Sequence, residues 1–194
     1  MKKLVVSLFV LSSLISNAQQ VDEDWKFRSV KAQFESIEVE GFPIDQDSLR
    51  IYMLEFINEF RKENGVKPLR YDSALNQGAL NHAVYLADRL ELTHYQTDTT
   101  SPYFTGHCPS LRTERNAGEN AAWSTYDKGD SMKDLAYQLF LQWKGSPGHK
   151  RNMLFGYKYF GFGVSVSKVS ALDPDFFPEL WTPSQNMMAV QTFN

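Results

Sequence analysis

Apolar residues return every three or four positions over residues 47–64 and again over 72–90. This is the period of a helix that buries one face, so the pattern predicts two amphipathic helices. Asp47 or Ser48 is placed to cap the start of the first helix, and Asp72 is placed to cap the second. The chain therefore opens its folded part with two helices, joined by a short turn.

Two further helices are predicted after a long irregular segment. One begins at Asp130 or Ser131 and runs to about Trp143, with apolar residues at helical spacing. The other begins at Ser146, followed by Pro147. Serine at the N-cap with proline at the first helical position is a strong start signal, and it predicts that capping occupies the serine hydroxyl.

The pattern changes to alternation near the end of the chain, which predicts strands. Apolar and small residues alternate from Tyr159 onward, and residues 188–193 read as a partner strand. Residues 97–115 show no period and contain two prolines, so they are expected to form a long surface loop. Helices first and strands last indicate an α+β domain, with helices packed on a small antiparallel sheet.

The N-terminus carries the features of an export signal. Lys2 and Lys3 precede a short apolar stretch, and small residues then place a cleavage site after Ala18. We expect a signal peptide at 1–18, a linker or N-terminal arm at 19–46 and one folded domain at 47–194. The apolar stretch is too short for a stable membrane anchor, so the mature chain is expected to be extracellular or periplasmic, without a transmembrane anchor.

Charge argues against one class of partner, and cysteine content excludes disulfides within the chain. The formal charge is −3, and it becomes −5 once the two signal lysines are removed. No Lys/Arg block is visible, which argues against a nucleic-acid partner. Cys108 is the only cysteine, so no disulfide can form within the chain.

Two histidines and one glutamate have side chains that are suited to a metal-binding or catalytic site. His94 follows the second predicted helix, Glu119 follows the long loop, and His149 lies in the first turn of the fourth helix. Imidazole and carboxylate groups suit zinc, and three protein ligands with one open position are usual at a reactive zinc centre. Spacing alone leaves open the alternative that these side chains only hydrogen-bond loops and helix ends.

Other candidate residues have simpler interpretations. His82 is predicted to be a half-buried residue on the face of the second helix. His107 and Cys108 are adjacent in the long loop, where a thiol without a fixed base is usually unreactive. Tyr95 and Trp123 flank the candidate site in sequence and are expected to be core or rim aromatics.

Several short motifs then occur in a definite order. They are Asn58-Glu59-Phe60-Arg61 with Gly65-Val66-Lys67-Pro68-Leu69, Thr93-His94, Gly118-Glu119-Asn120, Trp143 with Ser146-Pro147-Gly148-His149-Lys150-Arg151-Asn152-Met153-Leu154, and Gly161-Phe162-Gly163-Val164 with Val190-Gln191-Thr192-Phe193. Over about residues 48–194 this ordered set resembles the CAP superfamily. That family comprises cysteine-rich secretory proteins, antigen 5 and pathogenesis-related proteins, and its domain is also called the SCP domain.

The resemblance implies a fold and a site. The fold would be a three-layer α-β-α sandwich, with His94, Glu119 and His149 lining a central cleft. The chemistry of the residues adds that His94 and His149 would be the metal ligands for a divalent cation such as zinc, and that Asn120 and Asn152 would fix backbone turns or orient the site residues.

One acid of the family pattern is missing. Animal and plant relatives carry a second glutamate three residues after the motif tryptophan, where this chain has Ser146. We assign Ser146 a supporting role as a helix cap, and its presence favours binding over catalysis.

Three functional hypotheses follow. The first is a secreted binding or interaction module whose cleft takes a divalent cation or a small ligand, with a small-molecule or protein partner that the sequence does not name. The alternative is a metal-dependent hydrolase of peptide or cell-envelope substrates, with Glu119 as general base. A third hypothesis assigns the same residues a purely structural role.

Overall fold

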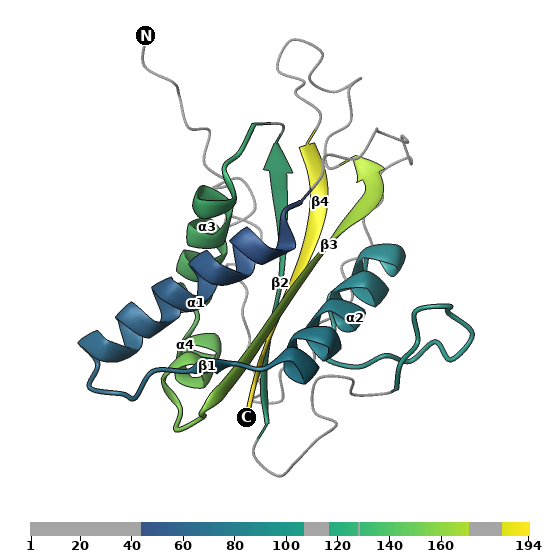
Figure 1. Ribbon diagram of the computed structural model, residues 1–194. Helices are drawn as coiled ribbons and strands as arrows, with labels where there is room; N and C mark the ends of the chain where they lie inside the picture. Colours follow the sequence, from purple (N-terminus) through teal and green to yellow (C-terminus); the bar gives the residue numbers. More distant parts are fainter. Residues whose placement is uncertain (1–43, 107–116, 128, 171–183) are drawn as a thin grey trace, which may run out of the picture.

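The computed structural model describes residues 44–106, 117–127, 129–170 and 184–194. The signal peptide, most of the N-terminal arm, His107 and Cys108 lie outside these residues. Along the chain the elements are α1 Gln46–Glu63, β1 Arg70–Tyr71, α2 Ser73–Arg89, β2 Gly118–Asp127, α3 Met132–Gly145, α4 Pro147–Leu154, β3 Tyr159–Ser170 and β4 Ser184–Phe193 (Figure 1).

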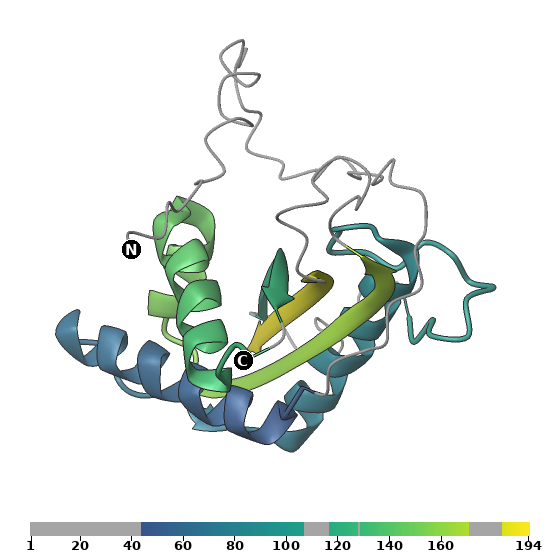
Figure 2. The same ribbon diagram turned by 90° about the horizontal axis from the view of Figure 1, so that it is seen from above.

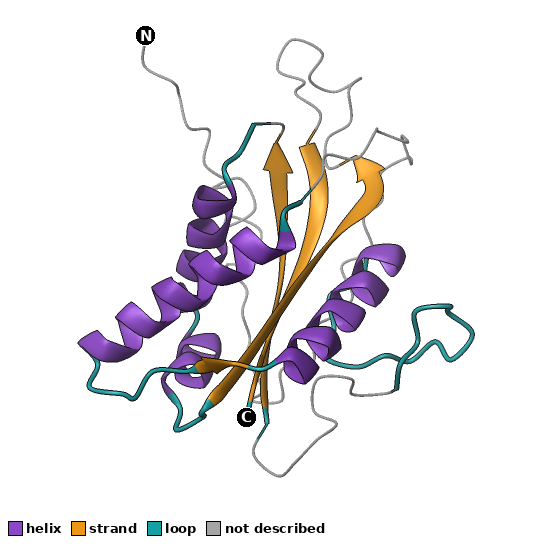
Figure 3. Cartoon of the chain, viewed as in Figure 1, coloured by secondary structure: helices purple, strands orange, loops and turns teal. Residues whose placement is uncertain are grey.

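The four strands form one mixed sheet in the order β1-β3-β4-β2 (Figure 3). Strand β4 is antiparallel to both β3 and β2. The two residues of β1 pair parallel with β3, so the expectation of a wholly antiparallel sheet is wrong at this edge. A parallel pair needs a crossover between its strands, and the long stretch of chain from α2 to α4 supplies it.

Helices cover both faces of the sheet, which confirms the predicted α-β-α layering (Figure 2). Helix α2 packs on one face against β3 and β4, over a smaller core of mainly α2, β2 and β4 residues. Helices α1, α3 and α4 cover the other face over a larger core. Within the described segments, no helix combines the length and apolar character that crossing a membrane requires.

Strand β3 shows why the alternating pattern forms this sandwich. Phe160, Phe162 and Val164 point into the larger core. Gly161 and Gly163 alternate with them on the opposite face, where a Cβ atom would overlap with the backbone of α2. The absence of side chains at these two positions lets helix and sheet approach closely.

Most helix boundaries agree with the predictions, and the caps explain where they differ. The side chains of Asp72 and Ser131 cap α2 and α3 as predicted. Helix α1 begins earlier than expected, because the carboxylate of Asp45, rather than Asp47 or Ser48, accepts hydrogen bonds from the main-chain N–H groups of residues 47 and 48 at 3.1 and 3.0 Å.

Strand β2 was not predicted, and its burial explains why. Its first five residues are all buried, so the sequence lacks the alternation of a strand with one exposed face. Strand β4 likewise begins four residues before the predicted start at 188. Since β2 carries Glu119, this strand is what fixes the glutamate in the sheet.

Arg61 ties α1 to the chain that follows α4. Its side chain is fully buried, and its guanidinium donates hydrogen bonds to the main-chain carbonyls of Lys67, Met153, Phe155 and Tyr157 at 2.7–3.0 Å. Burial lowers the pKa of this guanidinium. Because Phe155 and Tyr157 also line the cavity described below, Arg61 anchors one wall of the candidate site.

Candidate functional site

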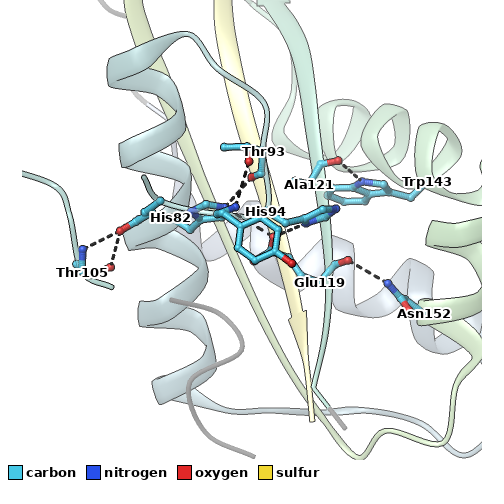
Figure 4. Close-up of polar contacts among 10 residues, drawn as sticks. His82, Thr93, His94, Thr105, Glu119, Ala121, Trp143 and Asn152 are labelled. Atoms are coloured by element: carbon cyan, nitrogen blue, oxygen red, sulfur yellow. Dashed lines mark hydrogen bonds and ion pairs between the residues drawn. The ribbon is translucent and has the colours of Figure 1, made fainter. Parts of the chain in front are cut away.

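His94 and Glu119 are in direct contact. His94 lies just after α2, and Glu119 is the second residue of β2. The Nδ1–H of His94 donates to Oε1 of Glu119 at 2.6 Å (Figure 4). The Glu119 side chain is only 4% exposed, so this short charge-assisted hydrogen bond is shielded from solvent.

Two asparagines join the Glu119 strand to α4. The side-chain N–H₂ of Asn152 donates to the carbonyl of Glu119 at 3.0 Å and to Oδ1 of Asn120 at 2.9 Å. The side-chain N–H₂ of Asn120 donates to the carbonyl of His149 at 3.2 Å and to Oε1 of Gln191 at 3.0 Å. These bonds fix the spacing between β2 and the helix that carries His149.

The three predicted site residues line one cavity. Its volume is about 300 Å³, and its lining comprises His94, Glu119, Gly148, His149, Arg151, Asn152, Phe155 and Tyr157. Tyr95 is exposed and Trp123 packs against the smaller core, so neither belongs to this lining. The cavity brings together residues from the loop after α2, from β2, from α4 and from the segment that follows α4.

One oxygen of Glu119 has no hydrogen-bond partner in the described part of the chain. Among the described residues, Oε2 is buried and receives no hydrogen bond, whereas Oε1 is held by His94. A buried acceptor without a donor typically costs about 1–3 kcal/mol. A carboxylate oxygen in this state, on a side chain that lines a cavity, is a point where a ligand carrying a hydrogen-bond donor or a positive charge would gain free energy.

His149 is in its neutral form at neutral pH. Burial, followed by the electrostatic effect of His94, lowers the pKa of His149 to about 4. Both causes disfavour a positive charge on His149. The site thus combines a neutral imidazole with a carboxylate that is already paired to the other imidazole.

Ser146 differs from its prediction. It occupies the N-cap position of α4, but its side chain makes no capping hydrogen bond, and Oγ is buried without a partner in the described part of the chain. The expectation that capping occupies this hydroxyl is therefore wrong. Pro147 presets the helical backbone of the first turn, and the main-chain carbonyl of Ser146 accepts from the N–H of Lys150 at 2.8 Å, so the helix begins without the side chain.

His82 belongs to the surroundings of the site, although its sequence position did not reveal this. It is fully buried rather than half-buried, and its Nε2 lies 3.7 Å from Oε1 of Glu119. The sequence contained one signal: residue 82 falls three positions after Ala79 and four before Leu86, on the buried stripe of α2. A histidine on such a stripe requires a polar partner inside the fold.

The residues of the cavity meet only part of what a metal ion needs. Within the described residues, no group of three or more His, Cys, Asp or Glu side chains is placed to hold a metal ion. Because Nδ1 of His94 is bonded to Glu119, any metal at this histidine would have to bind through Nε2. The arrangement does not match a three-ligand zinc centre, although its donor types suit zinc.

Comparisons with known proteins agree on the fold. The sequence model described as "CAP: Cysteine-rich secretory protein family" matches residues 54–172. No curated protein sequence matches the chain.

Solved structures add neighbours at low sequence identity. An extracellular protein containing an SCP domain from Bacillus anthracis matches with a TM-score of 0.50 and 17% identity, over 79% of this chain and 44% of that one. An outer surface protein from Borrelia burgdorferi matches with a TM-score of 0.49 and 17% identity, over 80% and 98% of the two chains. A cysteine-rich secretory protein from Staphylococcus aureus matches with a TM-score of 0.46 and 20% identity, over 79% and 41%. The chain thus spans less than half the length of the Bacillus protein, and the likeness concerns the fold alone.

Proposed function

The chain belongs to the CAP family, and from this premise we propose that it is an exported binding module whose cleft takes a small ligand against Glu119. The observation that carries the proposal is the buried Oε2 of Glu119, which has no hydrogen-bond partner among the described residues. The side chain lines a cavity of about 300 Å³, within the range of small-ligand pockets.

The chemistry of the cavity defines the class of ligand. Oε2 of Glu119 accepts, His149 lines the cavity as a neutral imidazole, and Phe155 and Tyr157 supply aromatic surface. A ligand that presents a cationic or N–H group to Glu119 and a flat apolar part to the aromatic rings satisfies all of these. A divalent cation such as zinc is a different candidate, which meets only the requirement at Glu119, and His94 and His149 are its proposed ligands.

Calorimetric titration of the mature domain tests the proposal, first with zinc chloride and then with small amines and amidines. We expect binding to weaken at least about tenfold in Glu119→Gln, because the amide presents an N–H₂ group or a neutral oxygen in place of the carboxylate. Glu59→Gln, the same change on the exposed face of α1, is the matched control and should bind as the wild type does.

The same titration separates the two ligand classes. Loss of zinc binding in His94→Ala and His149→Ala would support a cation, and binding of amines without zinc would support an organic ligand. Binding of neither probe, or equal binding by wild type and all three cleft variants, would refute the assignment of the cleft.

Hydrolysis of peptide or cell-envelope material is the second candidate function. It is favoured by the carboxylate of Glu119, which lines the cavity with an oxygen that has no hydrogen-bond partner among the described residues and is therefore available to take a proton from a bound water. Turnover of a peptide or peptidoglycan library by the wild type, with at least about a hundredfold loss in Glu119→Gln, would establish it. Unchanged turnover in that variant would remove Glu119 as the base.

Export is the third part of the proposal. Residues 1–18 have the charge and apolar pattern of a signal peptide, and the structural neighbour from Bacillus anthracis is described as extracellular. N-terminal sequencing of protein recovered outside the cytoplasm should begin at Gln19. Retention of Met1 in that fraction would contradict the signal peptide.

A further inference from the structure

A buried histidine that the proposed ligand site does not use lies directly behind it. His82 is on α2, is fully buried, and shares its stripe of the helix with apolar residues. Its Nε2 lies 2.9 Å from the main-chain carbonyl of Thr93, the residue before His94, and 3.7 Å from Oε1 of Glu119 (Figure 4). It therefore contacts the backbone next to one site residue and approaches the carboxylate of another.

The Thr93 carbonyl and Gln96 together fix which nitrogen of His82 carries the hydrogen, because the carbonyl can only accept a hydrogen bond from Nε2. The main-chain N–H of Thr105 donates to Oε1 of Gln96 at 2.7 Å, so the oxygen end of this amide faces Thr105. The N–H₂ end then points to Nδ1 of His82 at 3.4 Å and makes that nitrogen an acceptor. Consequently the hydrogen of His82 resides on Nε2, where it donates to the Thr93 carbonyl.

Two imidazole nitrogens thus approach the same carboxylate oxygen. Nδ1 of His94 is 2.6 Å from Oε1 of Glu119, and the N–H of His82 lies on Nε2, 3.7 Å away. Oε2, on the same carboxylate, is left without a donor among the described residues. Since His82 and Gln96 are both fully buried, no solvent replaces these contacts if one of them is removed.

We infer that His82 is a positioning residue of the cleft, which holds the Thr93–His94 backbone and Oε1 of Glu119 in register so that Oε2 is reserved for the ligand. Gln96 acts one step behind it by holding the ring in this tautomer through Nδ1. This inference deepens the proposed function and rests on it in one respect: that Oε2 of Glu119 is kept for a ligand. The hydrogen bonds of His82 and His94 can be measured in the ligand-free protein.

The experiment follows the Nδ1 proton of His94 by NMR of the mature domain labelled with ¹⁵N at histidine. In the wild type the hydrogen bond to Glu119 should protect this proton from exchange with water. His82→Phe keeps the ring volume and removes both nitrogens, so exchange should become about tenfold faster. In His82→Gln the side-chain N–H₂ can take the place of Nε2–H, so exchange should return toward the wild-type rate.

The design separates positioning from packing. Both substitutions at His82 are expected to lower the melting temperature, so stability alone does not decide. Unchanged exchange in folded His82→Phe, or no restoration in His82→Gln, would overturn the inference. If His82→Phe does not fold, Gln96→Leu decides in the same way, because it removes the amide that fixes the tautomer: faster exchange supports the inference, and unchanged exchange overturns it. No ligand is used, so failure to find one leaves this result intact.

Discussion

The polar side chains in and around the site are buried, and burial of a polar group costs free energy unless a hydrogen bond replaces its contacts with water. Glu119 has a side-chain exposure of 4%, and Oε1 is compensated by His94. His82 and Arg61 are fully buried and bond mainly to main-chain carbonyls. Each of these groups has a stated partner except Oε2 of Glu119 and the Ser146 hydroxyl, the two unpartnered buried side-chain atoms in the described residues.

The low pKa of His149 predicts a loss of stability in mild acid. The unfolded chain binds a proton at this histidine near its ordinary pKa of 6.5, whereas the folded protein binds it only near pH 4. The unfolded state therefore holds more protons between these values, and the folded state loses stability as the pH falls from about 6.5 to 4. Because the side chain is partly open to solvent, we expect this group to contribute about 1–2 kcal/mol.

Urea unfolding of wild type and His149→Gln at pH 7 and pH 4.5, with a chelator present, measures this contribution. All other groups titrate in both proteins. The free energy of unfolding lost between pH 7 and pH 4.5 therefore differs between wild type and variant only by the contribution of His149. The wild type should lose more of its free energy of unfolding than the variant. Equal losses would mean that the histidine is not held neutral in the folded state.

At the scale of elements, the close contact between α2 and β3 depends on two glycines of β3 that have no side chain. Gly161 and Gly163 face the helix, and a Cβ atom at either would overlap with backbone atoms of α2, which cannot move aside as a flexible side chain would. Helix α2 leads into the loop with His94 and carries His82, while β3 supports β4, which in turn pairs with the Glu119 strand. The closeness of helix and sheet therefore affects the geometry of the site.

Gly161→Ala and Gly163→Ala are each expected to destabilise the domain by about 1–3 kcal/mol, through overpacking against backbone. Gly145→Ala, at the last residue of α3, is the matched control. A Cβ atom there has no neighbour within 4 Å, so the change should be neutral or stabilising by less than about 1 kcal/mol. Thermal melts of the three variants check this, and an equal effect at positions 161 and 145 would contradict the close packing.

The sequence predicted the helices and strands that bury one face, because their apolar residues recur with the period of the element. The stripes of α1, α2 and α3, the cap at Asp72 and the alternation of β3 gave nearly correct boundaries. Strand β2 was missed because its first residues are buried on both faces and leave no alternation. The contact of His82 with Glu119 was missed for a different reason: it joins residues 37 positions apart and depends on tertiary packing that no local pattern encodes.

At the scale of the whole molecule, two hydrophobic cores stabilise the described structure. The larger core lies between the sheet and helices α1, α3 and α4, and the smaller lies under α2. The family is described as cysteine-rich, yet this chain has a single cysteine, Cys108. No disulfide within the chain can therefore contribute to its stability, which rests mainly on packing and buried hydrogen bonds.

This difference predicts that the melting temperature of the mature domain does not depend on reductant. Removal of a native disulfide from a small secreted domain typically costs about 2–5 kcal/mol. For a domain of this size each kcal/mol corresponds to about 2–4 °C, so a disulfide-dependent fold would melt several degrees lower under reducing conditions. Melts with and without dithiothreitol should coincide here, and Cys108→Ser should melt as the wild type does in both. A reductant-dependent decrease that Cys108→Ser abolishes would show instead that a cross-link between two chains stabilises the protein, because one cysteine can form a disulfide only with a second molecule.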